Sequence, residues 1–291
     1  MEVSPGLMKK NKRKFRWSNL IIVLLILAMV GIGGYMLADK FLPTNMSATK
    51  QELVSKVIPK RHKSISSSER TRISKQLMRQ TQTKQGLTKQ GFVSIPDVGI
   101  LQPIFNDAYS DKGLSAGANY ANRSEQDPEG KDVPAMGQDN YGLASHNFND
   151  GKTGFSALQK KTNADEPYLV NGQLKGSDWL NGKFIYLANG TNIYKYKITG
   201  QKLVDKDDVS VLNHSKTAKV TIISCLFPSI QYRIITSGKL VKSYTWNKAP
   251  ADVVTLFNLE KQPTNVHASW FNPGTEEGSN GDAGGTKTVS K

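Results

Sequence analysis

A run of 19 residues without a charged side chain, from Leu20 to Ala38, constrains this chain more than any other feature of its sequence. At 1.5 Å per residue, a helix of this length approximates the ~30 Å hydrocarbon core of a bilayer. The run is longer than the ~7–15 apolar residues of a cleavable signal peptide, and Gly33-Gly34-Tyr35-Met36 matches a cleavage site poorly. We therefore predict a retained transmembrane helix over residues 19–38.

Positive charge is concentrated on either side of this run. Residues 1–90 carry 18 Lys and Arg against 4 Asp and Glu, whereas residues 91–291 carry 21 against 20. The basic cluster Lys9–Arg16 precedes the run, and by the positive-inside rule it stays in the cytoplasm. We therefore predict a single-pass type II protein of the cell membrane, extracellular after Asp39. The balanced charge of 91–291 excludes a nucleic-acid partner, which would require an excess of Lys and Arg.

Composition divides the chain into five segments. The stalk is rich in Ser, Thr, Lys and Gln, with a helix-compatible stretch around Glu69–Arg79, and the C-terminal tail lacks the apolar residues needed to order itself. The predicted segments are a basic cytoplasmic tail (1–18), the transmembrane helix (19–38), an extracellular polar stalk (39–90), a globular domain with a C-terminal extension (91–272) and a disordered tail (273–291).

Short runs of β-branched and aromatic residues, separated by turn residues, begin at Phe92 and are typical of an all-β domain. The Asn189-Gly190 dipeptide predicts a tight hairpin because both residues tolerate positive φ, and Ala251–Leu259 predicts a short helix. About eight strands with short helices predict a closed or nearly closed barrel, since closure removes exposed strand edges. The candidate strands are Phe92–Ile95, Leu101–Ile104, Tyr141–Ser145, Lys183–Ala188, Ile193–Thr199, Val209–Val211, Val220–Leu226, Arg233–Lys239 and Lys242–Trp246.

Cys225 is the only cysteine, so the chain forms no internal disulfide. Free cysteines are often buried and inert, but a lone thiol in an exported protein also suggests a reactive group. Cys225 lies near the end of one candidate strand and Arg233 begins the next. If the intervening segment loops back, the two residues lie side by side. The guanidinium would then favour the thiolate and could brace a carbonyl oxygen or an oxyanion.

His146 is the candidate partner for this thiol among four histidines. His62 lies in the predicted stalk, His214 in a polar loop and His267 in the C-terminal region. His146 instead ends the candidate strand Tyr141–Ser145 and begins a polar loop, where a strand scaffold commonly presents functional side chains. A protonated imidazole beside the thiol would form an ion pair with the thiolate. We therefore expect His146→Ala to slow alkylation of the thiol at neutral pH.

Four groups of segments between about Gly91 and Val241 match the pattern of one known family: Ser94–Ile100 with Pro103–Phe105, Leu143–Asn147 with Asp150–Lys152 and Phe155–Leu158, Thr221–Cys225, and Arg233 with the strand that follows it. On these segments the chain resembles the class A sortases, membrane-anchored cysteine transpeptidases of Gram-positive bacteria. Ser145 stands where Gly often precedes the histidine of that family, and Ile222 and Ser224 replace Leu and Thr. These conservative departures bear on substrate preference more than on activity.

The resemblance implies the sortase β-barrel and cleavage of a Leu-Pro-x-Thr-Gly-type sorting signal, between Thr and Gly, on secreted proteins. Cys225 would attack the Thr carbonyl to form a thioester, and His146 would protonate the leaving amine. A peptidoglycan-precursor amine of the lipid II type would then resolve the thioester with His146 as base, while Arg233 holds the substrate or stabilises the oxyanion. The residues that correspond to the substrate groove are Pro96, Ala144, Ile223 and Ser224.

Calcium and other functions are the remaining alternatives. Some class A sortases bind calcium through acidic groups near the groove, but no glutamate-rich ligand spacing is evident here, so we expect neither a metal nor a cofactor. A secreted cysteine peptidase would hydrolyse the same kind of peptide, and a wall-binding module would not need the thiol. An L,D-transpeptidase would place His and Cys within a few residues of each other. The candidate calcium ligands are Asp107, Asp111, Asp205, Asp207 and Asp208.

Overall fold

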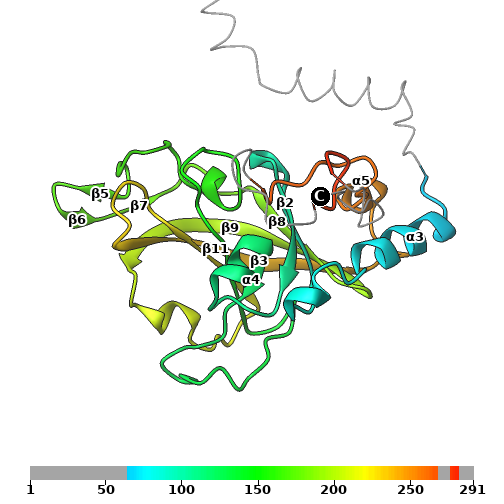
Figure 1. The fold of residues 1–291 in the computed structure, drawn as a ribbon, viewed down its shortest axis with the longest axis horizontal. Coiled ribbons are helices and arrows are strands. Elements are labelled where there is room, and N and C mark those ends of the chain that lie inside the picture. Colours follow the sequence, from blue (N-terminus) through cyan, green and yellow to red (C-terminus); the bar gives the residue numbers. More distant parts are fainter. Residues whose placement is uncertain (1–63, 268–275, 282–291) are drawn as a thin grey trace, which may run out of the picture. The chain divides into compact units, whose positions relative to one another are not determined.

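Eight strands close into a β-barrel in the computed structural model, which describes residues 64–267 and 276–281 (Figure 1). Around the barrel the strands follow the order β11-β10-β4-β3-β2-β1-β8-β9, and pairing between β9 and β11 closes the circle. Closure pairs the two strands that would otherwise be exposed edges, and it confirms the predicted all-β barrel. The strands are β1 (Gly91–Ile95), β2 (Ile100–Phe105), β3 (Ala118–Tyr120), β4 (Asn140–Ala144), β8 (Phe184–Ala188), β9 (Asn192–Asp205), β10 (Lys219–Cys225) and β11 (Tyr232–Thr245).

Smaller elements decorate this barrel. The two-residue strand β7 (Gly176–Ser177) pairs with β9, and β5 (Leu169–Val170) pairs with β6 (Gln173–Leu174) in a separate ribbon. The described helices are short and lie in the connections or beside the barrel. They are α3 (Ser67–Leu77), α4 (Asp111–Ala116) and α5 (Ala251–Thr255), with 3-10 turns η1 (Thr83–Gln85), η2 (Pro96–Val98), η3 (Ser156–Leu158) and η4 (Val209–Leu212).

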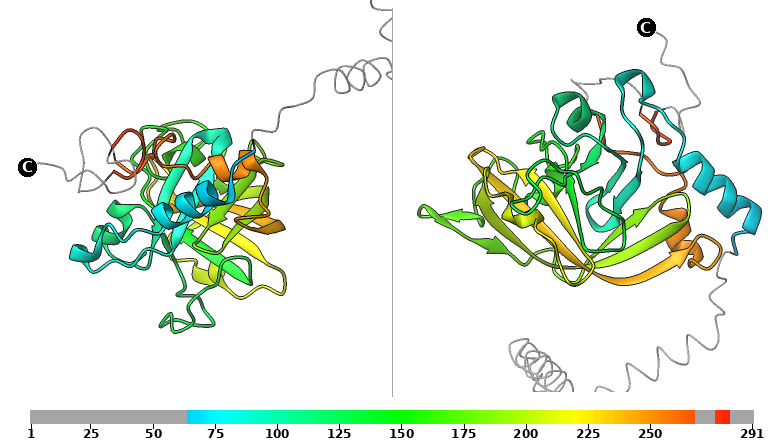
Figure 2. Two further views of the ribbon diagram at one scale, coloured as in Figure 1. Left: turned by 90° about the vertical axis from the view of Figure 1, so that its right-hand side faces the viewer. Right: turned by 90° about the horizontal axis from the view of Figure 1, so that it is seen from below.

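The two longest strands, β9 and β11, run side by side along one wall of the barrel (Figure 2). The sequence predicts two strands over Arg233–Lys239 and Lys242–Trp246, but β11 is continuous because register shifts after Ser237 and Leu240 absorb the irregularity. The strand predicted over Val209–Val211 is wrong. This segment forms η4, whose first turn is capped by the Asp208 side chain accepting the Ser210 N–H.

The β8–β9 hairpin forms at Asn189-Gly190 as predicted, but a different interaction stabilises the turn. Neither residue has a positive φ. The Asn189 side-chain oxygen instead accepts the backbone N–H groups of Thr191 at 3.0 Å and Asn192 at 2.9 Å. Asparagine thus closes the turn with its side chain, which is its other common role in turns.

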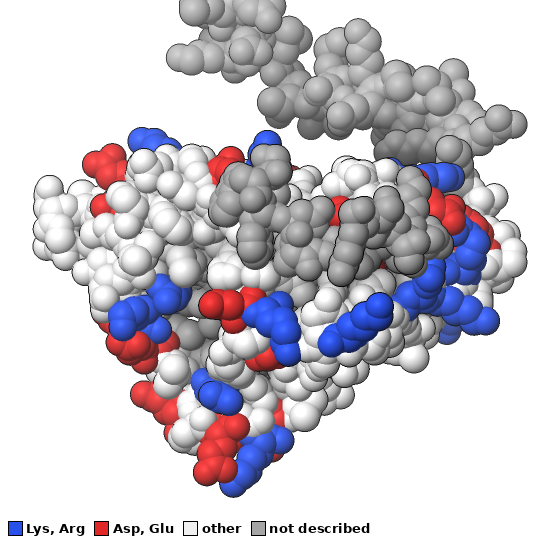
Figure 3. All heavy atoms as spheres, in the orientation of Figure 1, with Lys and Arg blue, Asp and Glu red and all other residues white. Residues whose placement is uncertain are grey.

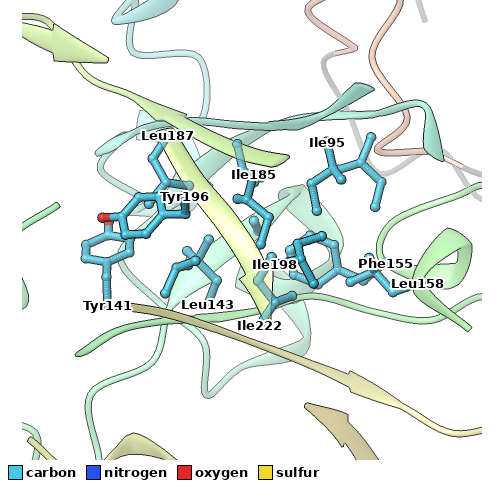
Figure 4. Close-up of a cluster of buried hydrophobic side chains, with 14 of the residues drawn as sticks. Ile95, Tyr141, Leu143, Phe155, Leu158, Ile185, Leu187, Tyr196, Ile198 and Ile222 are labelled. Atoms are coloured by element: carbon cyan, nitrogen blue, oxygen red, sulfur yellow. The ribbon is translucent and has the colours of Figure 1, made fainter. Parts of the chain in front are cut away.

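The main core fills the barrel interior. Figure 4 shows side chains of β4, β8, β9 and β10 converging there, among them Tyr141, Leu143, Ile185, Tyr196 and Ile222. Successive residues of a strand point to opposite faces, so alternate residues of β4 and β10 leave this core and face outward. That alternation decides which side chains reach the functional site.

Helix α3 packs against the barrel, although the sequence places residues 64–90 in the polar stalk. Ile73 and Leu77 are buried in a second apolar cluster with Phe92, Trp246 and Phe257. Figure 1 shows α3 and α5 at the same end of the molecule. The helix predicted around Glu69–Arg79 is therefore present, and its sparse apolar residues suffice to dock it because they fall on one face.

Part of the predicted disordered tail is also ordered. Residues 276–281 pack against the barrel unit through polar contacts rather than through an apolar face. The buried Glu277 forms an ion pair with the buried Lys89 and accepts the Thr81 hydroxyl at 2.7 Å. Asn280 donates to the Thr264 carbonyl at 2.9 Å. A prediction based on apolar content alone misses such a segment.

The predicted cytoplasmic tail, transmembrane helix and first part of the stalk lie outside the described residues. Within 64–267 and 276–281 no helix combines the length and the apolar character needed to cross a membrane. On the face of the described surface seen in Figure 3, acidic and basic side chains are interspersed, in keeping with the nearly equal numbers of each in residues 91–291.

Candidate active site

Cys225 and Arg233 form the last pair of the ladder between β10 and β11. The strands are antiparallel, and residues directly opposite each other on antiparallel strands project to the same face. The loop between them turns the chain back, as the sequence predicts. Cys225 and Arg233 are both half-buried and line one cavity.

His146 reaches the same cavity through a parallel pairing. Strands β4 and β10 are parallel and in register up to the pair Ala144 and Ile223. Two residues further along each chain lie His146 and Cys225. Because strand side chains alternate between faces, this spacing keeps both on the face opposite the barrel core. The strand register therefore brings the predicted histidine and cysteine to one side of the sheet.

The cavity shared by these three residues has a volume of about 580 Å³. This is within the ~300–1,000 Å³ typical of ligand sites. Its wall is mainly apolar, and charged side chains of Arg123, Lys206 and Asp208 lie among the lining residues. The apolar lining comes from five parts of the fold, namely α4, β4, η4, β10 and the β9–β11 wall. It includes Leu114, Ala144, Val204, Val209, Val211, Leu212, Ile223 and Ile235.

Burial lowers the pKa of His146 below its ordinary value of 6.5, and the nearby Asp111 carboxylate offsets part of that effect. The imidazole packs edge-on against the Phe148 ring, with 5.4 Å between centroids. A lowered pKa favours the neutral imidazole at pH 7. The neutral imidazole is the form that can take up a proton, and the ion pair of His146 with the Cys225 thiolate stays a prediction.

Arg233 is held by its own loop. Its Nη1 donates to the carbonyl oxygens of Ile230 at 2.8 Å and Tyr232 at 3.0 Å. These bonds fix one arm of the planar guanidinium and leave the other edge to turn toward a ligand. The geometry is compatible with the predicted oxyanion or carbonyl contact.

The predicted groove residues divide into two groups. Ala144 and Ile223 line the cavity, as predicted. Ser224 also belongs to the lining, but it is only 1 % exposed and its hydroxyl is buried, because it occupies the alternate strand position that faces inward. Pro96 lies away from this cavity, and its role in binding substrate stays a prediction. It is exposed at the start of η2, between β1 and β2.

Three of the carboxylates considered as candidate calcium ligands serve local structure. Asp107 accepts the Ser110 hydroxyl at 2.6 Å beside α4, and Asp205 accepts the backbone N–H of Asp207 at 3.0 Å. Asp208 caps η4. Among the described residues no group of three or more His, Cys, Asp or Glu side chains is arranged to hold a metal ion.

Two buried amides beside the site were not singled out from sequence. Asn147 follows His146 directly, and its Nδ2 donates to the carbonyl oxygen of Cys225 at 2.8 Å. The same nitrogen donates to Oε1 of Gln159 at 2.8 Å. The position of Asn147 next to the histidine was the only available sequence signal, since Gln159 meets it through tertiary structure alone.

A barrel that gathers a cysteine, a histidine and an arginine at one apolar-walled cavity defines a cysteine-dependent enzyme. The model of the sortase domain family matches residues 93–241. This segment contains all three residues, the strands β4 and β10, and most of β11. The chain therefore belongs to the sortase family, and it is an enzyme of the sortase cysteine transpeptidase type.

The chain is also similar to individual proteins that carry the name sortase A. Sortase A of Listeria monocytogenes is 29% identical over 154 residues, which cover 53% of this chain and 57% of that protein. Sortase A of Streptococcus agalactiae is 26% identical over 270 residues, covering 88% of this chain and 100% of the relative. A solved structure of the Listeria monocytogenes sortase A aligns with a TM-score of 0.44 at 25% identity, covering 58% of this chain and 96% of that one.

Proposed function

We propose that this chain is a class A sortase that joins secreted proteins to the cell wall. It would cleave a Leu-Pro-x-Thr-Gly-type sorting signal between Thr and Gly and transfer the new Thr carbonyl to a peptidoglycan-precursor amine of the lipid II type. The strongest support is the strand register that places Cys225 beside Arg233 and two residues past the Ala144–Ile223 pair, level with His146. Sequence similarity to proteins named sortase A supports the class.

The first half-reaction uses the neutral imidazole. His146 takes the thiol proton of Cys225 as the sulfur attacks the Thr carbonyl carbon, and the carbonyl oxygen becomes an oxyanion beside Arg233. The C–N bond to Gly then breaks, and the proton held by His146 passes to the leaving amine. The product is a thioester between Cys225 and the Thr carbonyl.

The second half-reaction reverses the proton path. An acceptor amine attacks the thioester, His146 takes a proton from the attacking nitrogen, and the C–S bond breaks as the new amide forms. That proton returns to the sulfur and regenerates the thiol. A thioester retains enough energy for amide formation, so transfer competes with hydrolysis according to which nucleophile reaches the cavity.

We further propose that residues 19–38 anchor the enzyme as a single-pass type II protein, with the catalytic domain outside the cell. Support comes from the charge-free run and from the basic cluster Lys9–Arg16 that precedes it. Such an anchor would hold the cavity near the lipid-linked acceptor and near secreted substrates as they emerge.

The decisive experiment incubates the full-length protein in detergent micelles with a Leu-Pro-x-Thr-Gly peptide and a glycine-based amine, followed by mass spectrometry. We expect the amide transfer product, and a mass adduct of the acyl group on Cys225, the only cysteine. Cys225→Ala should abolish both. Product formed by Cys225→Ala would overturn the mechanism, and exclusively hydrolysed product at saturating amine would indicate a peptidase instead.

A further inference from the structure

Asn147 and Gln159 link the loop that carries the histidine to the strand that carries the cysteine. Both side chains are buried, with exposed fractions of 6 % and 5 %. The Asn147 Nδ2 donates to the Cys225 carbonyl oxygen and to the Gln159 Oε1, each at 2.8 Å. One amide group therefore ties the residue after His146 to the main chain of the nucleophile.

Gln159 extends this link into the β10–β11 loop. Its Oε1 accepts the backbone N–H of Phe227 at 3.0 Å, and its Nε2 donates to the carbonyl oxygen of the same residue at 2.6 Å. Phe227 lies two residues after Cys225. The two amides thus fix the main chain at Cys225 and at Phe227, so the turn that leads away from the nucleophile is held on both sides.

The opposite end of the network fixes the histidine loop. The Asn147 Oδ1 accepts the backbone N–H of Asn149 at 2.8 Å, and the Gln159 Nε2 also donates to the carbonyl oxygens of Lys161 and Ala164. Each amide therefore uses both its oxygen and its nitrogen. Buried networks with every group satisfied are rigid, and losing one member leaves the others without partners.

From this geometry we infer that Asn147 and Gln159 are positioning residues for the transfer reaction. This inference rests on the proposed function. They set the position of the Cys225 main chain relative to His146, and hence the approach of the sulfur to the imidazole and to the substrate carbonyl. Because catalysis is sensitive to misplacement by about 1 Å, which costs roughly 100-fold, their loss reduces turnover without removing any reacting group.

A matched control is available on the same loop. The Asn265 Nδ2 donates to the carbonyl oxygens of Lys152 at 2.8 Å and Gly154 at 2.9 Å. Asn265 therefore also braces the histidine loop with a side-chain amide, but none of its hydrogen bonds reaches β10 or the β10–β11 loop. A variant at Asn265 therefore distinguishes the loss of general support for the loop from the loss of positioning of the nucleophile.

The test compares full-length Asn147→Leu, Gln159→Leu, the double variant and Asn265→Leu. We expect each of the first two to lower kcat by about 10–100-fold with KM changed less than about threefold. Since the two amides act as one unit, the kcat of the double variant should lie within about threefold of the kcat of the more impaired single variant. Asn265→Leu should keep kcat within about twofold of the parent, whatever its effect on the unfolding midpoint.

Alkylation of Cys225 by a small uncharged electrophile supplies a readout that needs no peptide transfer. We expect the pH dependence of the alkylation rate to shift in Asn147→Leu and to remain unchanged in Asn265→Leu. Absence of transfer by the parent protein would refute the proposed function while leaving this alkylation comparison intact.

Two results would overturn the inference. One is a kcat for Asn147→Leu within twofold of the parent together with an unchanged alkylation profile. The other is an Asn265→Leu variant as impaired as Asn147→Leu, which would reduce the network to ordinary loop packing. If Asn147→Leu does not fold, Gln159→Glu decides by the same criteria, because it keeps the Oε1 acceptor and the side-chain size but removes the Nε2 donor.

Discussion

At the scale of single residues, the protonation state of His146 decides how the site can work. Its pKa is lowered by burial, with Asp111 acting in the opposite direction. A histidine whose folded pKa lies below 6.5 is neutral at pH 7 and becomes protonated only as the pH falls through that lower value. The neutral form is the one able to accept the thiol proton.

The direction of the His146 pKa shift predicts how catalysis depends on pH. We expect the acid limb of the kcat/KM profile to lie below pH 6.5, because activity requires the neutral imidazole. Asp111→Asn removes a charge that favours the imidazolium, so it should move that limb to still lower pH. The measurement is peptide transfer between pH 4.5 and 8. An acid limb above pH 6.5, or a shift toward higher pH in Asp111→Asn, would contradict the assignment.

At the scale of elements, strand pairing assembles the active site and also places like charges opposite each other. The register that aligns Cys225 with Arg233 also places Lys239 of β11 directly opposite Lys197 of β9 on one side and Lys219 of β10 on the other. Directly opposed like charges destabilise a sheet. Burial and, after it, the neighbouring Lys202 lower the pKa of Lys219, while Asp139 acts in the opposite direction.

Relief of this crowding should stabilise the barrel. We expect Lys239→Gln to raise the free energy of unfolding by about 0.5–1 kcal/mol at low salt, as measured by urea denaturation. The gain should shrink as added salt screens the lysines. Lys216→Gln, in the loop before β10, serves as the control and should change stability little. A gain that persists unchanged in salt would indicate a cause other than charge repulsion.

Helix α3 offers a second prediction at this scale. Leu77 is fully buried between the helix and the barrel. We expect Leu77→Ala to lower the free energy of unfolding by about 2–5 kcal/mol, the usual cost of a cavity left by a large apolar side chain. Exposed Lys75→Ala on the same helix is the control for helix propensity. A loss below about 0.5 kcal/mol for Leu77→Ala would mean that α3 behaves as a detached stalk in solution.

At the scale of the whole molecule, the described C-terminal residues are tied to the N-terminal side of the barrel. The Lys89 and Glu277 side chains are 0% and 2% exposed and form an ion pair. Lys89 also lies over the Phe92 ring, 5.4 Å from its centroid. A buried pair contributes little net stability, but removing one partner leaves an uncompensated charge inside.

We therefore expect Glu277→Gln to lower the free energy of unfolding by about 3–5 kcal/mol. The double variant Lys89→Met with Glu277→Leu should recover most of that loss, because it removes both charges and keeps apolar bulk. Urea denaturation of the single and double variants measures the difference. Equal destabilisation by the single and double variants would show that hydrogen bonding, rather than the buried charge, holds this segment.

Much of the fold and site followed from local sequence signals. Alternating β-branched residues located most barrel strands. The alternation of buried and exposed side chains can be recognised in the sequence of each strand by itself. Cys225 and His146 were identifiable because one is the only cysteine and the other ends a strand at a polar loop. The three-residue strand β3 and the 3-10 turn η4 escaped prediction, since neither is long enough to show a period.

Tertiary structure alone decided the rest. The parallel pairing of β4 with β10 joins strands distant in sequence, and no local pattern specifies it. The same holds for the meeting of Asn147 with Gln159, the exclusion of Pro96 from the cavity and the burial that lowers the pKa of His146. The sequence by itself determined which residues can do chemistry, because reactivity belongs to side-chain type. Folding decided which of them meet, because distance, burial and hydrogen bonding depend on chain segments that come together only in three dimensions.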